Sequence, residues 1–188
     1  MSRELRERML GLSSDGLYAA LAAGHAIAPE ALDDAMYRGI SLNLPGPIEA
    51  LTWKTFRKVF FRDAARGVLR GWNVRMEQTG IDGPSLPMKK EGAQVAFGHY
   101  EVVPLDGYRV PRGAAPRGLL LDYGKGGNPR LDPTNRVRDP IVALVEGSVD
   151  LLLGWTYVDV GLTTMATPSF FLLEREGPID VVVPRPTP

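Results

Sequence analysis

His99 and Glu101 are the residues whose spacing best suits proton transfer. His99 is one of two histidines in the chain, and Glu101 follows it by two positions. Residues two apart in a strand point to the same face of a sheet, so the imidazole and the carboxylate would be neighbours. A nearby carboxylate orients an imidazole, and together they can form an acid/base pair. Because spacing fixes no third group beside them, we favour the simpler interpretation of an exposed, polar strand face.

Asp122 is a second candidate, because it interrupts an apolar run that begins at Gly118. A buried carboxylate needs a partner, and either Arg38 or Arg70 could supply one. Alternatively, Asp122 caps the loop that follows it. That loop, residues 124–128, holds a lysine among glycines, but its spacing is not that of a Walker phosphate loop, so we predict a flexible turn.

Aromatic residues occur in most of the segments that we expect to be strands. They could line the lumen of a barrel and bind a flat apolar ligand, or they could simply fill the core. Polar residues on the same strands, such as Arg38, Arg70 and His99, favour the pocket, because a lumen fully packed with side chains would not need polar groups. The aromatic set is Tyr37, Trp53, Trp72, Tyr100, Trp155, Tyr157 and Phe170, and the predicted ligand-binding residues are Tyr37, Arg38, Trp72, Tyr100, Trp155, Tyr157 and Phe170.

Composition argues against several classes of protein. Lys+Arg and Asp+Glu both number 22, and a chain without basic excess is a poor candidate for binding nucleic acid. The chain lacks cysteine, has no histidine spacing typical of metal sites, and has no serine in a nucleophile elbow. We therefore predict no metal and no cofactor. No segment has the character of a secretory signal or a membrane span, so we expect a cytoplasmic protein without membrane insertion.

Helix-prone sequence fills roughly the first 35 residues, and alternating sequence follows it. We expect helices over Ser2–Leu10 and from a cap at Asp15 to a stop at Gly24, then a turn that Pro29 opens. Residues 48–53 could form a helical turn, and residues 55–61 fit a strand or a helix. Strands are predicted at 36–43, 68–78, 93–103, 118–123, 140–146, 149–160, 169–174 and 179–183.

Strands of this number and spacing are typical of sandwiches and barrels, and closure removes exposed edges. The predicted fold is mainly β: an antiparallel, lipocalin-like barrel or a strongly curled sheet over residues 36–184. A helical arm, residues 1–35, would cover one mouth, and residues 185–188 would form a tail.

Two parts of the sequence resemble the GXWXG family and the uncharacterised domain that usually follows it. Tyr37-Arg38-Gly39 and Trp53-Lys54-Thr55-Phe56 are similar to the first, although Tyr37 replaces a tryptophan and Thr55 a glycine. Leu120–Tyr123, Asp139–Val142, Leu151–Gly154 and Phe170–Arg175 are similar in order and character to the C-terminal strands of the second. The resemblance implies a calycin-like, lipocalin-type fold. It implies no activity, because that family has no firmly assigned one.

Three functions are compatible with these patterns. The leading hypothesis is a barrel that binds an apolar or aromatic metabolite in its lumen, oriented by Arg38, His99 or Asp122. The second is a cofactor-free cyclase or isomerase that uses His99, Glu101 or Asp122 as acid and base in the same cavity. The third is a structural or interaction protein with a solid barrel. The sequence leaves a homodimer open.

Overall fold

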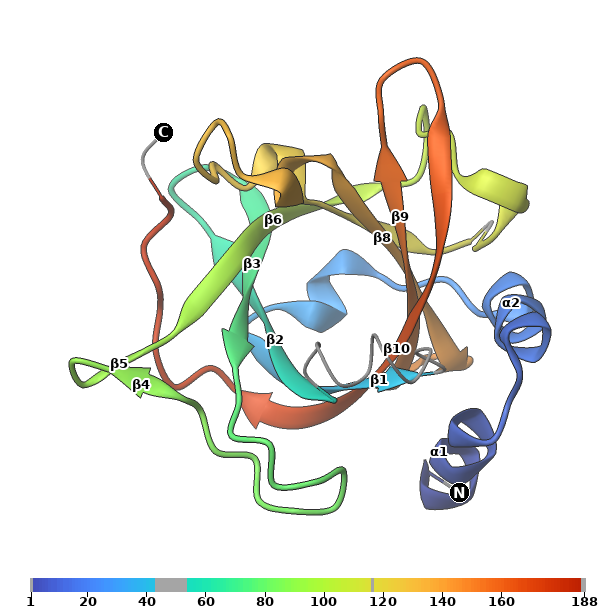
Figure 1. Ribbon diagram of the computed structural model, residues 1–188, viewed down its shortest axis with the longest axis horizontal. Coiled ribbons are helices and arrows are strands. Elements are labelled where there is room, and N and C mark those ends of the chain that lie inside the picture. Colours follow the sequence, from blue (N-terminus) through green and yellow to red (C-terminus); the bar gives the residue numbers. More distant parts are fainter. Residues whose placement is uncertain (1, 43–53, 116, 187–188) are drawn as a thin grey trace.

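The chain forms a closed, eight-stranded antiparallel barrel in the computed structural model, which describes residues 2–42, 54–115 and 117–186 (Figure 1). Each barrel strand pairs with its neighbours in sequence, and β1 closes the ring by pairing with both β2 and β10. The barrel strands are β1 (Ala35–Leu42), β2 (Thr55–Asp63), β3 (Val68–Arg75), β6 (Ala96–Pro104), β7 (Leu119–Asp122), β8 (Val137–Val145), β9 (Ser148–Asp159) and β10 (Thr164–Pro178).

This architecture confirms the mainly β, antiparallel barrel that the alternating segments predict. Residues 55–61, which fit two periods, belong to strand β2. The strand predicted at 179–183 was wrong, because β10 ends at Pro178 and extended, non-strand chain follows. The helical turn predicted at 48–53 lies outside the described residues. A small hairpin, β4 (Lys89–Lys90) and β5 (Ala93–Gln94), projects between β3 and β6.

The N-terminal helices α1 (Ser2–Leu10) and α2 (Ser14–Ala23) lie against the outer wall of the barrel, beside β8, β9 and β10 (Figure 1). Ser13 caps α2 by accepting a hydrogen bond from the Gly16 amide, and the helix ends at Gly24 as expected. Leu17 and Leu21 pack on Trp155 in one apolar cluster. The two helices of the arm therefore cover a side of the barrel, where we expected the arm to cover a mouth; only its last part, residues 27–35, packs at one end of the lumen.

One end of the lumen is filled with apolar side chains. The 3-10 turn η1 (Pro29–Leu32) follows α2, and Leu32 is fully buried in a cluster with Tyr37, Phe60 and Tyr100. At the other end, the inward positions of the strands carry polar side chains together with phenylalanine rings, and they leave a cavity. The inward side chains thus fill the lumen along one half of the strands. The cavity occupies the other half.

The C-terminal segment, residues 179–186, covers part of the outer face of the barrel. Ile179 and Val183 pack on a cluster that contains Val59, Trp72 and Val74. The Arg70 guanidinium donates a hydrogen bond of 3.1 Å to the Val183 carbonyl, which fixes the segment in place. Large parts of both faces of the barrel wall are therefore buried. Among the helices of the described chain, none has the length and apolar character to cross a membrane.

Candidate functional site

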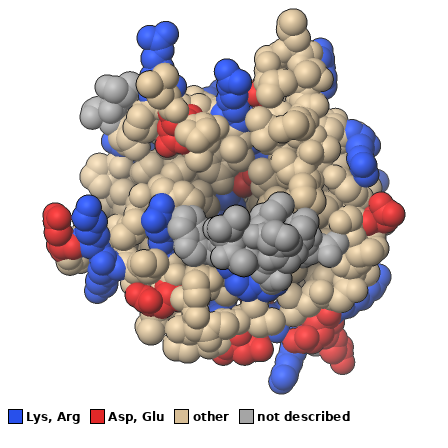
Figure 2. All heavy atoms as spheres, in the orientation of Figure 1, with Lys and Arg blue, Asp and Glu red and all other residues tan. Residues whose placement is uncertain are grey.

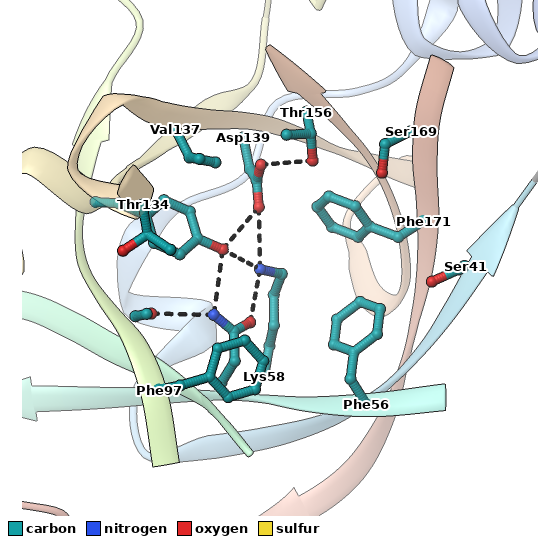
Figure 3. A pocket seen from close by; sticks show the side chains of 13 residues that line it. Ser41, Phe56, Lys58, Phe97, Thr134, Val137, Asp139, Thr156, Ser169 and Phe171 are labelled. Carbon is teal, nitrogen blue, oxygen red and sulfur yellow. Dashed lines mark hydrogen bonds and ion pairs between the residues drawn. The ribbon is translucent and has the colours of Figure 1, made fainter. Parts of the chain in front are cut away.

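A cavity of about 240 Å³ opens in the unfilled half of the barrel. The face seen along the barrel is hollowed near its centre (Figure 2). Residues from most of the strands line this cavity, and Lys58 of β2 points into it together with Asp139 of β8 (Figure 3). The lining residues are Ser41, Phe56, Lys58, Asn73, Phe97, Gly98, Tyr123, Thr134, Val137, Asp139, Thr156, Ser169 and Phe171.

Lys58 is the centre of a hydrogen-bond network at the floor of the cavity. Its ammonium donates to Asp139 Oδ2 at 3.0 Å, to Asn73 Oδ1 at 3.0 Å and to the Tyr123 hydroxyl at 2.6 Å. The Tyr123 hydroxyl in turn donates to Asp139 Oδ2 at 2.8 Å. These three partners use all three N–H groups of the ammonium.

Further hydrogen bonds hold the partners of Lys58 in position. Asn73 Nδ2 donates to the Gly98 carbonyl at 3.0 Å, which leaves its side-chain oxygen facing Lys58. The Thr156 hydroxyl donates to Asp139 Oδ1 at 2.8 Å, so both carboxylate oxygens are engaged. The network is therefore preorganised by the barrel wall and does not depend on a ligand to form it.

Phenylalanine rings form the apolar wall of the cavity, and glycines on adjacent strands make room for two of them. A Cβ on Gly39 would lie 2.3 Å from the Phe56 ring, and a Cβ on Gly154 would lie 2.1 Å from the Phe171 ring. The rings thus lie across positions that tolerate no side chain. Lys58 Nζ is 5.6 Å from the centroid of Phe56 and 4.8 Å from that of Phe171, within cation–π range.

Burial perturbs the ionisable groups of this network. Lys58 is fully buried, and desolvation lowers its pKa below the ordinary value, although the Asp139 carboxylate acts in the opposite direction. Burial, followed by the charge of Asp139, raises the pKa of Tyr123 well above its usual value. The phenol therefore keeps its proton at neutral pH and donates a hydrogen bond to Asp139, and the amine loses its proton more readily than an exposed lysine would.

This arrangement combines a nucleophilic amine, a carboxylate and a phenol in one water-accessible space. Such a set can bind a polar group, transfer protons or form a covalent bond through the amine. It does not resemble a metal centre. Within the part of the chain that the structure describes, no three carboxylate or imidazole side chains come together as metal ligands.

The structure separates the aromatic residues predicted to line the lumen. Residues that pair across adjacent strands share a face of the sheet, and Lys58 points inward, so its partner Tyr37 on β1 points inward as well. Tyr37 and Tyr100 lie in the filled half of the lumen. Trp72 instead packs outside the barrel under residues 179–186, and Trp155, Tyr157 and Phe170 pack in the cluster that contains α2. Trp53, the seventh member of the aromatic set, lies outside the described residues.

The outward position of these four residues corrects the predicted lumen. Thr156, Ser169 and Phe171 line the cavity, so the residues that alternate with them along β9 and β10 face outward. The physical reason is that the outer wall is itself covered and apolar. The apolar residues that alternate along β9 and β10 therefore lie on the outer face, under the helices. The inner face of the same strands carries part of the polar network.

His99 and Glu101 share a face of β6, as their spacing predicts, but that face is the outer one. Glu101 forms ion pairs with Arg66 at 3.6 Å and with Arg185 at 3.2 Å. Burial, and secondly the charge of Arg70, lowers the pKa of His99 to about 4. The imidazole is therefore neutral near pH 7. Neither residue lines the cavity, so they do not serve it as acid and base.

Asp122 and Arg38 also lie outside the cavity. The partner of Asp122 is Arg138, at 3.1 Å, and the Tyr108 hydroxyl donates to the carboxylate at 2.6 Å. Asp122 also accepts a hydrogen bond from the Gly124 amide, as the capping alternative predicts. Arg38 donates to backbone carbonyls of the loop after β3, at Gly80 and Gly83. Both residues have structural partners that account for them.

Lys58 and Asp139 were not identified as functional residues from the sequence. Tyr123 was considered only as a residue at the start of a loop. One signal was available for Lys58. If residues 55–61 are interpreted as a strand, Phe56, Lys58 and Phe60 share one face, and a lysine between two phenylalanines on a buried face requires an acidic partner. Asp139 carries the corresponding signal, because it stands directly before the apolar run that starts at Pro140.

No family model, curated protein or solved structure matches the chain. The resemblance to the GXWXG family therefore stays a prediction, and the function is argued from the cavity alone.

Proposed function

We propose that the protein binds a small, uncharged molecule with an aromatic or apolar body, whose polar end faces Lys58, Asp139 and Tyr123. The observation that best supports this is the combination, in one cavity, of a buried charge pair and a wall of phenylalanine rings. Small-molecule sites typically combine apolar walls with a few fixed polar groups that orient the ligand.

The volume of the cavity limits the size of the ligand. At about 30 Å³ for each water in the liquid, a space of about 240 Å³ holds about eight waters. Ligand sites in proteins commonly range from roughly 300 to 1,000 Å³. The space inside the barrel therefore suits one ring with a short substituent.

Charge compensation within the network favours a neutral ligand. The Lys58 ammonium and the Asp139 carboxylate lie 3.0 Å apart and are almost fully buried, so their charges cancel. A third charge placed beside them would be desolvated without a partner, which is costly. A carbonyl or hydroxyl group can instead replace one of the three acceptors of the Lys58 ammonium without adding a charge.

The fold itself gives no reason for this ion pair. Buried ion pairs contribute little net stability and are often replaced by apolar side chains without loss. The other half of the same lumen is filled by apolar and aromatic residues such as Phe60 and Ile141. Perturbed ionisable groups beside a cavity are typical of functional sites, and this contrast supports a role for the pair in recognition.

Ligand-observed NMR with a defined panel tests the proposal. We expect benzaldehyde and acetophenone to bind at least about tenfold more tightly than benzoate and benzylamine, because the charged analogues are desolvated without a counterion. The Ser169→Phe variant, which places a ring in the cavity, should abolish binding. Failure of every neutral probe to bind, or binding that Ser169→Phe leaves unchanged, would contradict the proposal.

Adjacent phenylalanines on β10 provide a matched control. Phe171 lines the cavity, whereas Phe170 is fully buried on the outer face against Tyr18 and Trp155. Phe171→Leu should weaken probe binding by about tenfold, since it removes part of the aromatic wall. Phe170→Leu should lower the free energy of unfolding by about 1–3 kcal/mol and leave probe affinity unchanged.

The cyclase or isomerase hypothesis is not proposed in its original form, because His99, Glu101 and Asp122 lie outside the cavity. The solid barrel is not proposed either, since part of the lumen is open.

A further inference from the structure

Among the described residues that line the cavity, Lys58 alone carries an amine. Its nitrogen lies at the junction between the polar network and the aromatic wall. Phe171 approaches the nitrogen from one side, at 4.8 Å to the ring centroid, and Tyr123 from another, at 5.3 Å. A ligand whose ring packs against Phe56 and Phe171 would place its substituent at this amine (Figure 3).

We infer that Lys58 forms a reversible imine with an aldehyde or ketone held in the cavity, an inference that rests on the binding function proposed above. A carbonyl is an uncharged, polar substituent of the kind that the cavity favours, and its carbon is the electrophile that a primary amine attacks.

The chemistry needs no oxidant, reductant or additional reactant. The Lys58 ammonium first gives one proton to Asp139 Oδ2, which lies 3.0 Å away. The neutral amine then forms a C–N bond to the carbonyl carbon, and the carbonyl π pair moves to oxygen. The nitrogen loses a proton and the oxygen gains one, which gives a carbinolamine. The Asp139 carboxyl returns its proton to the hydroxyl group, and loss of water leaves a protonated C=N bond, so ammonium and carbonyl yield iminium and one water; loss of the iminium proton gives the neutral imine.

The surrounding groups are placed to move these protons. The Tyr123 hydroxyl lies 2.6 Å from Lys58 Nζ and 2.8 Å from Asp139 Oδ2, so it connects the amine to the carboxylate. Such a positioned acid and base accelerate both addition and loss of water. If the product is the protonated iminium, its positive charge replaces that of the ammonium beside Asp139, and the charge balance of the buried pair is retained.

Desolvation favours the first step. Burial lowers the pKa of Lys58, so a larger fraction of the amine is neutral and nucleophilic than at the surface. Exposed lysines of the same chain, such as Lys89 and Lys90, have no such environment and serve as internal references.

Borohydride trapping tests the inference on the intact wild-type protein. The protein is incubated with benzaldehyde and then with sodium borohydride, which delivers hydride to the imine carbon while nitrogen takes a proton, leaving a stable benzylamine. Peptide mass spectrometry then locates the benzyl group. We expect Lys58 to be labelled at least tenfold faster than Lys89 and Lys90.

A paired variant, Lys58→Met with Asp139→Asn, serves as the control. It removes the amine without leaving a lone carboxylate, so the label on Lys58 disappears while the surface lysines react as before. Labelling of Lys89 and Lys90 at the rate of Lys58, or no labelling of Lys58, would overturn the inference.

Parallel NMR measurement of benzaldehyde binding separates this inference from the function on which it rests. Binding without a label on Lys58 refutes the imine and leaves the binding function intact. If there is neither binding nor a label, both are refuted.

Discussion

At the scale of single residues, the pair Lys58–Asp139 is the feature that distinguishes this barrel from a plain apolar core. Both side chains are almost fully buried and 3.0 Å apart. Removing one partner of such a pair leaves the other charge buried without a counterion. Removing both partners eliminates the attraction between them, but it also eliminates the cost of desolvating the two charges. The coupling between the two positions therefore has a measurable signature.

We predict that Lys58→Met alone lowers the free energy of unfolding by about 3–5 kcal/mol, because the Asp139 carboxylate is left buried without a counterion. The paired change Lys58→Met with Asp139→Asn should cost less than about 2 kcal/mol, since the amide still accepts a hydrogen bond from Thr156 or Tyr123. Urea denaturation of the wild type, of Lys58→Met, of Asp139→Asn and of the paired variant measures these values and completes the double-mutant cycle. Additive losses would show that the two side chains are not coupled.

At the scale of secondary-structure elements, alternation predicts where strands lie but not which face of each strand is inside. Trp72, Val74 and Met76 alternate with polar residues, which indicates a half-buried strand, but the covering layer is residues 179–186 on the outside. Asn73, between Trp72 and Val74, faces inward and holds Lys58. The inner face could not be identified from one strand, because the helical arm and the C-terminal segment bury the outer wall as well.

The covering role of the C-terminal segment leads to a prediction. A chain that ends at Pro178 lacks the contacts of Val183 with the Trp72 cluster and the ion pair between Arg185 and Glu101. The Trp72 indole should then become accessible, seen as red-shifted emission and stronger quenching by acrylamide. The same truncation in a Trp72→Phe background provides the control and should show neither change. An unaltered spectrum would mean that the segment does not protect Trp72.

At the scale of the whole molecule, the sequence predicts the barrel and a pocket in it, and errs on the residues that make the pocket. The alternation and the helical start are local properties, and the structure confirms seven of the eight predicted strands and both helices; the eighth barrel strand is β2, which the sequence left open between strand and helix. The network of Lys58, Tyr123 and Asp139 joins three segments that are distant in sequence, so only the register of the closed barrel brings them together. No spacing rule predicts such a meeting.

The stability of the whole protein should depend on pH through His99. Its folded-state pKa is lowered to about 4 by burial and by Arg70, below the ordinary value of 6.5. The unfolded chain therefore binds the proton more readily, and the stabilisation present above pH 6.5 is lost as the pH falls towards 4. The free energy of unfolding should fall with a slope of at most about 1.4 kcal/mol per pH unit in this window.

Urea denaturation of the wild type and of His99→Gln between pH 4 and pH 7 checks this expectation. The variant keeps the backbone pairing with Asn128, which does not use the imidazole. Its stability should be flatter with pH than that of the wild type. Equal slopes for the two proteins would assign the effect to other groups.

The seam between β1 and β10 has a consequence for how the protein acquires its site. Ala35 pairs with Pro178, so the ring is completed only when segments from opposite ends of the chain meet. Closing so large a loop is slow and entropically costly, and it comes after the neighbouring hairpins can form. Ser41 and Phe171 contribute to the cavity from either side of that seam. During synthesis, the cavity is complete only after β10 has left the ribosome, so the binding proposed above would report the final step of folding.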